Sequence, residues 1–443
     1  MTASDRTRAG ALAAAAMALG VACSCGRTAG APDAGDAGRD AGDAGRDGGH
    51  RDAGHDAGQD AAVDPGPAGW VRLGGLPAAC DIEVATNPEA LGNLREVSCG
   101  PGCRELEPVW PREGLPYFMV ALGVGGHDGT TGHFTATHGI SDGRAVDFIS
   151  DDRGRVVAAW RSLVTPDDCY VGAHTRALGT IGFTVNAPVG PRRSLVLFRL
   201  ESEAPDAARV LHTFTSDELG ANGLQRLLSQ PGRVAVDMQP GGRVYSLALD
   251  GTTRLVAGGG SSGEIAFLDA LSGSALFYTL WGVDHHIGVS VGGAPGTVLI
   301  DPAGADADML RTDGVDLYWQ QGYGRITDGR FERIEIWTSP YATDPAGLRP
   351  RRIALAPDGL LDPRFRASFG YAAWNMITGQ IAVFRASDGL RAVVTPPDGT
   401  VPSHGGLLYV GPEELAFGSG PLRSFPPETT HVRFVRYDAM TWE

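Results

Sequence analysis

Short runs of alternating apolar and polar residues, separated by turn residues, fill the chain from about residue 105 onward. Asp-Gly between such runs predicts a hairpin, because a type I′ turn requires positive φ angles. No 12-residue stretch keeps helical periodicity free of Gly and Pro, and the best helix candidate is one short element around Ser216–Leu228. The pattern therefore predicts an all-β domain. Its eight Asp-Gly dipeptides begin at Asp128, Asp142, Asp250, Asp313, Asp328, Asp358, Asp388 and Asp398.

One hairpin pattern recurs along this domain. Gly263–Gly273 aligns without gaps to Gly379–Gly389, and related patterns begin at Gly143, Gly242 and Gly296. A hairpin repeated about every 40 to 60 residues is typical of propeller blades, because each small sheet buries its faces only against its neighbours. The Gly263–Gly273 unit resembles the blade hairpins of quinoprotein-like and WD-like β-propellers. This resemblance implies a β-propeller and carries no functional residues with it.

The length of the β domain limits the number of blades. Residues 105–443 allow six to eight blades of about 40 to 50 residues, and we predict seven. Tandem β-sandwiches are the alternative, since their strands have similar spacing. The tail His431–Tyr437 alternates with period two, and we predict that it closes the ring by pairing inside a sheet near Tyr117–Leu122.

The N-terminal residues have the composition of an export signal. Arg6 and Arg8 precede an apolar run, Ala9–Ala22, that is shorter than the roughly 20 residues needed to span a bilayer. Leu19–Cys23 resembles the lipobox of bacterial lipoproteins, although Gly20 stands where that family usually has Leu. The resemblance implies a signal peptide at residues 1–22 and lipidation at Cys23. An ordinary cleaved signal is the alternative reading, and Cys25 is a second lipidation candidate.

Residues after the lipobox predict a location and a tether. In Gram-negative lipoproteins an Asp after the lipidated Cys favours the inner membrane, so Ser24 implies the outer membrane or cell surface, with the periplasmic face left open. Repeated Asp-Ala-Gly triplets follow, with almost no apolar residues to bury. We therefore expect residues 23–68 to form a disordered tether, and residues 69–104 to lead from it into the propeller domain at 105–443.

Composition excludes several kinds of chemistry. All 37 basic residues are Arg, so Schiff-base catalysis and phosphate binding through a Lys side chain are excluded. The net charge of −15 gives no general electrostatic reason to bind nucleic acid. No cofactor is predicted, and the oligomeric state is left open.

Four cysteines of the exported domain predict disulfides. Cys80, Cys99, Cys103 and Cys169 allow three connectivities, and we favour Cys80 with Cys99 and Cys103 with Cys169. The second pair would tie the leading segment to the β domain. A half zinc site at Cys99 and Cys103 is the alternative, but no second closely spaced Cys or His pair would complete it.

Motifs for nucleophiles and metals are weak on this fold. The loop Gly259–Gly263 matches a nucleophile elbow, but a strand follows it where that motif needs a helix. His133 and His138 are five residues apart and would point to opposite faces of one strand, as would His285 and His286, so no metal site is predicted. A central channel could still gather one histidine from each of several blades. The histidines considered are His127, His133 and His138 beside Asp128, and His285 and His286 after Asp284.

Aromatic residues concentrate in residues 318–341. Their rings could stack on sugars or anchor a protein partner, while core packing also explains aromatic residues on strands. Phe331 and Tyr341 complete the cluster, and the four residues assigned to a binding surface are Tyr318, Trp319, Tyr323 and Trp337.

No convergent catalytic set is visible in the sequence, so an enzyme is less expected than a binding protein. We predict an outer-membrane-anchored lipoprotein whose propeller is a non-catalytic scaffold for a protein or glycan. The alternatives are an exported propeller hydrolase or lyase with its site at the central channel, and a structural envelope protein. The side chains along the central channel distinguish these functions.

Overall fold

The chain divides into two units, Met1–Asp64 and Pro65–Glu443, and the described residues all belong to the second. The predicted signal peptide, Cys23 and the tether lie outside the described residues, as does the loop at residues 259–263. The computed structural model describes residues 69–91, 94–108, 118–139, 145–164, 168–188, 192–219, 223–239, 242–258, 265–282, 284–325, 330–359, 365–376, 378–396, 400–421 and 431–443.

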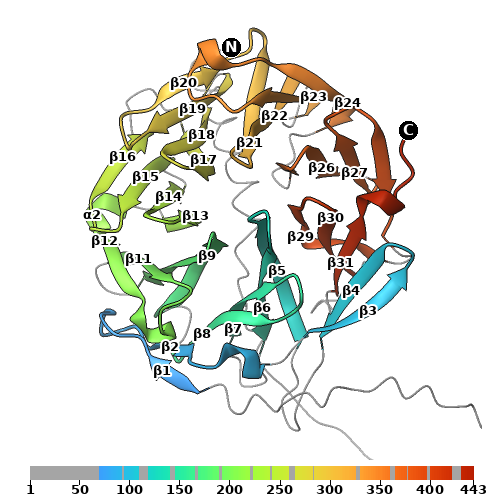
Figure 1. Ribbon diagram of the computed structural model, residues 1–443. Coiled ribbons are helices and arrows are strands. Elements are labelled where there is room, and N and C mark those ends of the chain that lie inside the picture. The colour runs from blue at the N-terminus through green and yellow to red at the C-terminus, as the bar shows by residue number, and fades with distance from the viewer. Residues whose placement is uncertain are drawn as a thin grey trace, which may run out of the picture. The chain divides into compact units, whose positions relative to one another are not determined.

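Seven antiparallel sheets stand around a central axis and form a seven-bladed β-propeller (Figure 1), as the sequence predicts. Blades 2 to 6 each contain four strands that follow one another along the chain from the axis outward. Blade 2 contains β9 (Tyr170–Ala177), β10 (Thr180–Ala187), β11 (Arg193–Leu200) and β12 (Arg209–Phe214). Blade 3 contains β13 (Gly223–Gln230), β14 (Arg233–Gln239), β15 (Arg243–Ala248) and β16 (Thr253–Ala257).

The next three blades repeat this plan. Blade 4 contains β17 (Ile265–Ser272), β18 (Ala275–Trp281), β19 (His285–Val291) and β20 (Thr297–Ile300). Blade 5 contains β21 (Ala305–Thr312), β22 (Asp316–Arg325), β23 (Phe331–Pro340) and β24 (Arg351–Gly359). Blade 6 contains β25 (Arg366–Ser368), β26 (Tyr371–Asn375), β27 (Ile381–Arg385) and β28 (Arg391–Val394).

Blades 1 and 7 contain strands from the start of the described chain. Residues 69–104, expected to lead into the propeller, supply outer strands to both blades. Blade 1 contains β5 (Phe118–His127), β6 (Gly132–Gly139), β7 (Ala145–Asp151) and β8 (Val156–Ser162), followed outward by β2 (Ile82–Ala85) and β1 (Trp70–Arg72). Blade 7 contains β29 (Thr400–Val410), β30 (Glu414–Pro421), β31 (His431–Arg436), β4 (Cys103–Pro108) and β3 (Leu94–Gly100).

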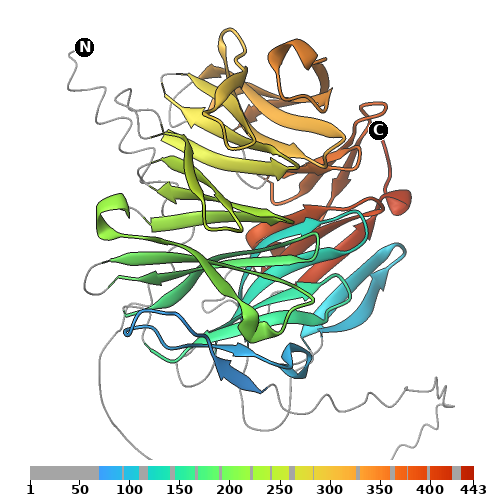
Figure 2. The same cartoon turned by 60° about the vertical axis from the view of Figure 1, so that its left-hand side comes forward.

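The C-terminal strand closes the ring, which confirms the prediction for the tail. β31 lies between β30 and β4, and Val432 is directly opposite Leu106. The Arg433 Nε donates a 2.5 Å hydrogen bond to the Glu105 Oε2 across the same joint. Figures 1 and 2 both show the hairpin of β3 and β4 beside the C-terminal strands. Tandem sandwiches are therefore excluded.

Hydrophobic side chains fill the space between each pair of neighbouring blades, in seven clusters of described residues. The cluster between blades 7 and 1 joins Phe134 and Phe148 to Leu408 and Phe434. Each side chain of this size stabilises the fold by about 1.5 to 3 kcal/mol when it is fully buried. The ring is thus closed by core packing as well as by strand pairing.

Short helices connect some strands, and one predicted helix is mostly wrong. Ser216–Leu219 (α2) is helical, but Gly223–Gln230 forms the innermost strand of blade 3. Leu224 and Leu227 of this strand pack into the core between blades 2 and 3, so tertiary packing overrides the local helical pattern. The 3-10 helices are η1 (Pro88–Leu91), η2 (Pro205–Ala207), η3 (Pro345–Gly347) and η4 (Tyr437–Ala439).

The aligned repeat segments do not occupy equivalent places in their blades. Gly263–Gly273 contains β17, an innermost strand, whereas Gly379–Gly389 contains β27, the third strand of blade 6. Their similarity therefore reflects the alternation shared by all blade strands. Asp-Gly dipeptides do mark turns between paired strands at Asp128, Asp250, Asp313 and Asp388.

Both disulfides form, but the favoured connectivity is wrong. The structure pairs Cys80 with Cys169 and Cys99 with Cys103, each with a Cα–Cα distance of 5.1 Å. Cys99 and Cys103 face each other across the hairpin of β3 and β4. Cys80 precedes β2, and β2 pairs with β8, which brings it beside the segment that follows β8. Strand pairing between distant segments thus determines the connectivity.

Candidate functional site

Arginines on three innermost strands connect successive blades. Each guanidinium donates a hydrogen bond to a backbone carbonyl of the following blade, or of the residue leading into it. Hydrogen bonds from a charged donor are stronger than those between neutral groups, so these bonds hold adjacent innermost strands together. The pairs are Arg226 with Leu268 at 3.0 Å, Arg311 with Phe365 at 3.2 Å and Arg366 with Leu408 at 3.2 Å.

In blade 4 the carbonyl acceptor Leu268 is followed directly by an acidic residue, Asp269. In blade 6 the accepting carbonyl of Phe365 comes directly before the donor Arg366, and in blade 4 Asp269 likewise follows the acceptor Leu268. The Asp269 Oδ2 accepts a 2.6 Å bond from the Thr279 hydroxyl, and its Oδ1 lies 3.6 Å from the Arg311 Nη1. A buried carboxyl of blade 4 therefore lies beside a guanidinium of blade 5.

Burial has the largest effect on the pKa of the Asp269 carboxyl. It raises the pKa of Asp269 to about 6, while the nearby Arg311 guanidinium acts in the opposite direction and Asp308 raises the pKa further. The pKa of Arg311 is lowered, also mainly by burial. Both shifts show that loss of hydration outweighs the attraction between the two charges.

A second cluster lies where blade 4 meets blade 5. Trp281 ends β18 and His285 begins β19, and their rings stack in parallel with centroids 4.7 Å apart. The Trp281 Nε1 donates a 3.2 Å hydrogen bond to the Oδ2 of Asp308 on β21. The backbone N–H of His285 donates to the Asp306 Oδ1 at 2.9 Å. Two carboxylates of one strand therefore position both aromatic residues.

Arg325, at the end of β22, completes this cluster. Its Nε and Nη2 both donate to the Asp306 Oδ2, at 3.1 and 2.7 Å, and its Nη2 lies 3.1 Å from the His285 Nε2. The Arg325 side chain is 44% exposed, whereas those of Asp306 and His285 are 8% and 12% exposed. A buried carboxylate thus fixes a guanidinium that solvent can reach.

The geometry of His285 favours binding over proton transfer. A guanidinium only donates hydrogen bonds, so the His285 Nε2 must accept from Arg325 and its proton must sit on Nδ1. That nitrogen lies 3.7 Å from the Asp308 Oδ2. The lone pair that a general base would use is therefore already engaged.

The other histidines do not converge with His285. His133 is buried on β6, and burial lowers its pKa to about 3. His127 ends β5, where its ring packs against Phe369 and Tyr409. The side chain of His138 lies outside the described residues. Within the described ranges, no group of three His, Cys, Asp or Glu residues is arranged to hold a metal ion.

The aromatic segment divides between core and surface. Tyr318 and Trp319 are completely buried, so neither ring can contact a partner. Tyr323 and Trp337 are partly buried, and the Trp337 Nε1 donates a 3.1 Å hydrogen bond to Glu335. These two are the only members of the proposed binding set with any exposure.

Sequence reasoning missed Asp306, Asp308 and Arg325. The alternation of Asp306 and Asp308 on one strand was a signal for a shared polar face, and His285 was considered only as a metal ligand. Arg325 had no signal of its own, because its partners come from two other strands in two blades.

No protein-family model and no curated protein matches this chain. Solved structures similar to it include a catalytically inactive virginiamycin B lyase from Staphylococcus aureus with quinupristin, 13% identical over 75% of this chain and 98% of that chain, with a TM-score of 0.43. A Mycobacterium tuberculosis puromycin-hydrolyzing peptidase is also 13% identical, over 73% of this chain and 52% of that chain, with a TM-score of 0.46. A nidogen/laminin complex chain is 16% identical over 60% of this chain and 96% of that chain, with a TM-score of 0.34. No activity is transferred from these proteins.

No helix in the described ranges has the length and apolar character needed to cross a membrane.

Proposed function

We propose that this protein is an outer-membrane lipoprotein whose propeller binds a carboxylate-bearing protein or glycan without chemical turnover. Lipidation at Cys23 would anchor the chain, and residues 23–68 would serve as the tether. The observation that carries the binding proposal is the half-exposed Arg325 guanidinium, fixed by the buried Asp306 beside the Trp281 and His285 rings.

The Arg325 Nε and Nη2 donate to Asp306 and His285, which leaves the two N–H groups of Nη1 to donate to a ligand. A hydrogen bond from a charged guanidinium to a carboxylate is stronger than a neutral one. The Asp306 carboxylate holds Arg325 through two nitrogens, so little side-chain entropy is lost when a ligand binds. Trp281 and His285 add an aromatic surface next to the charge. A ligand with a carboxylate beside an apolar ring face or chain matches this arrangement.

Calorimetric titration of the purified protein tests the proposal. Trigalacturonate represents an acidic glycan and triglutamate an acidic peptide, with maltotriose and triglutamine as their neutral counterparts. We expect one acidic ligand to bind. Arg325→Gln should lower the affinity for this ligand by about tenfold to a hundredfold, which is the effect of losing a hydrogen bond to a charged group. Equal binding of the neutral counterpart would contradict the proposal.

Arg209→Gln is the matched control. The Arg209 side chain is 43% exposed and pairs with Glu203 at 3.0 Å, but it belongs to blade 2. If both variants weaken binding equally, the effect comes from net charge and not from the site. If only Arg325→Gln weakens binding, the ligand contacts the junction of blades 4 and 5.

An exported hydrolase or lyase is the second candidate function, favoured by the raised pKa of Asp269 beside Asp308. A buried carboxyl that ionises near pH 6 can donate or accept a proton under physiological conditions. Turnover of the bound ligand, lost in Asp269→Asn while binding persists, would support this activity. Absence of both binding and turnover would favour the structural envelope role.

A further inference from the structure

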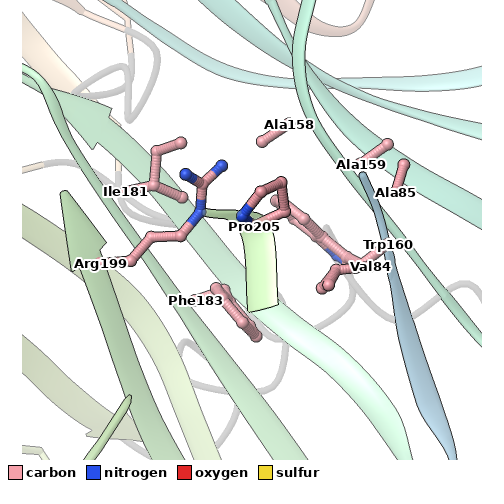
Figure 3. Close-up of a pocket in the computed structure, with 9 residues that line it drawn as sticks. All are labelled: Val84, Ala85, Ala158, Ala159, Trp160, Ile181, Phe183, Arg199 and Pro205. Atoms are coloured by element: carbon pink, nitrogen blue, oxygen red, sulfur yellow. The ribbon is translucent and has the colours of Figure 1, made fainter. Parts of the chain in front are cut away.

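A small cavity lies between blades 1 and 2, away from the junction of blades 4 and 5. Its walls come from β2 and β8 on one side and from β10, β11 and η2 on the other (Figure 3). The cavity offers about 10 Å³ to the centre of a water-sized molecule, which is room for about one guest of that size. Most of its lining is apolar, including Val84, Ala158, Ile181 and Phe183.

The cationic group of this cavity is Arg199 of β11. Figure 3 shows its guanidinium extending into the space beside Ile181 and Pro205. The residue is only 5% exposed. Its Nη1 donates to two backbone carbonyls, those of Leu200 at 3.3 Å and Glu203 at 3.2 Å. These carbonyls anchor the neighbouring loop but carry no negative charge.

Arg199 forms no ion pair within the described part of the chain. The acidic side chains that act on its charge, Glu201 and Glu203, are paired with other arginines. Glu201 lies 2.9 Å from the Arg176 Nη2, and Glu203 lies 3.0 Å from the Arg209 Nη1. A buried cation that forms no direct ion pair is unfavourable.

A second donor lines the same cavity. Trp160 is 2% exposed, and its Nε1 has no hydrogen-bond partner among the described residues. A buried N–H group without an acceptor costs about 1 to 3 kcal/mol.

We propose that this cavity binds one small monovalent anion of the halide class through the Arg199 guanidinium. The charge calls for an anion, and the limited volume excludes phosphate, sulfate and organic carboxylates. Water fits the volume but cannot neutralise the guanidinium. The site joins two blades, so the anion would stabilise the ring and would have no role in binding at Arg325.

Thermal unfolding in chloride and in gluconate, at constant ionic strength, tests the proposal. We expect the midpoint to rise by about 2 °C for each tenfold increase in chloride above the dissociation constant, because the ion binds only the folded state. Arg199→Met should abolish the chloride dependence, and Arg209→Gln should retain it. Equal midpoints in chloride and gluconate for the unmutated protein would overturn the proposal.

Bromide replacement keeps the test decisive if Arg199→Met does not fold. In crystals of the unmutated protein grown with bromide, we expect one anomalous peak beside the Arg199 guanidinium. A peak that water alone explains, with no anomalous signal in the cavity, would overturn the proposal.

Discussion

Asp269→Asn should make the protein more stable near neutral pH, although it removes one partner of an ion pair. The unmutated carboxyl must ionise in a buried position, and its pKa rises from 3.8 to about 6. Two pKa units correspond to about 3 kcal/mol of lost stability when the group is charged. Asparagine has the same shape and carries no charge, so it avoids this cost.

The sign of the pH dependence follows from the raised pKa. The folded state holds the proton of Asp269 more tightly than the unfolded state, so the group favours folding only while it is protonated. The stability that the protonated group contributes is therefore lost as the pH rises from about 4 to about 6. Above that range this group causes no further change in stability with pH. The stability gained by Asp269→Asn should be close to zero near pH 4 and reach about 3 kcal/mol near pH 8.

Urea unfolding of both proteins across this pH range provides the measurement. Asp237→Asn is the control, because Asp237 is also buried but each of its oxygens accepts a backbone N–H, from Arg226 at 2.9 Å and from Leu268 at 3.1 Å. An asparagine has only one oxygen and would leave one of these donors unpaired, so the control should lose stability. A loss of stability in Asp269→Asn at every pH would show that its attraction to Arg311 outweighs burial.

Further predictions concern the disulfides, the ring closure and the anchor. Replacing Cys80 and Cys169 by Ser should cost more stability in urea unfolding than replacing Cys99 and Cys103. The first disulfide closes a loop of 89 residues, worth about 4 to 5 kcal/mol. The second closes a loop of 4 residues, worth about 2 kcal/mol. Deleting residues 430–443 removes β31, so near-ultraviolet circular dichroism should lose its folded signal; a native spectrum would contradict closure by this strand. Cys23→Ser should move the protein from membrane to soluble fractions or block its processing, and unchanged fractionation would refute lipidation there.

The sequence allowed the architecture to be predicted because each blade depends on local patterns. Alternation and Asp-Gly turns are properties of a single hairpin, and they indicated an all-β domain. The recurring hairpin and the length of the domain then indicated a propeller of seven blades, which the structure confirms. The alternation of His431–Tyr437 likewise indicated a strand inside a sheet. The fold could therefore be predicted without knowing which residues touch across blades.

Contacts between blades could not be predicted in this way. The disulfide of Cys80 and Cys169 depends on the pairing of β2 with β8, which no local pattern reveals. Tyr318 and Trp319 looked like binding residues because strand alternation alone does not show which face a neighbouring blade covers.

The candidate site was equally hidden, because it is assembled from separate strands. Arg325 has its role only beside Asp306 and His285, and the three lie on different strands of two blades. Arg226 and Arg311 each follow a bulge in their innermost strand, and a bulge interrupts the simple alternation along a strand.

Fluorine NMR of protein labelled with 5-fluorotryptophan tests the binding site most directly. The chain has 8 Trp residues, and Trp281→Phe assigns the resonance of the ring stacked on His285. At a concentration of the acidic ligand equal to its dissociation constant for the unmutated protein, we expect the Trp281 resonance to shift in the unmutated protein and in Arg209→Gln, and to stay almost in place in Arg325→Gln. A shift confined to other tryptophans, or one that persists in Arg325→Gln, would contradict binding at the junction of blades 4 and 5.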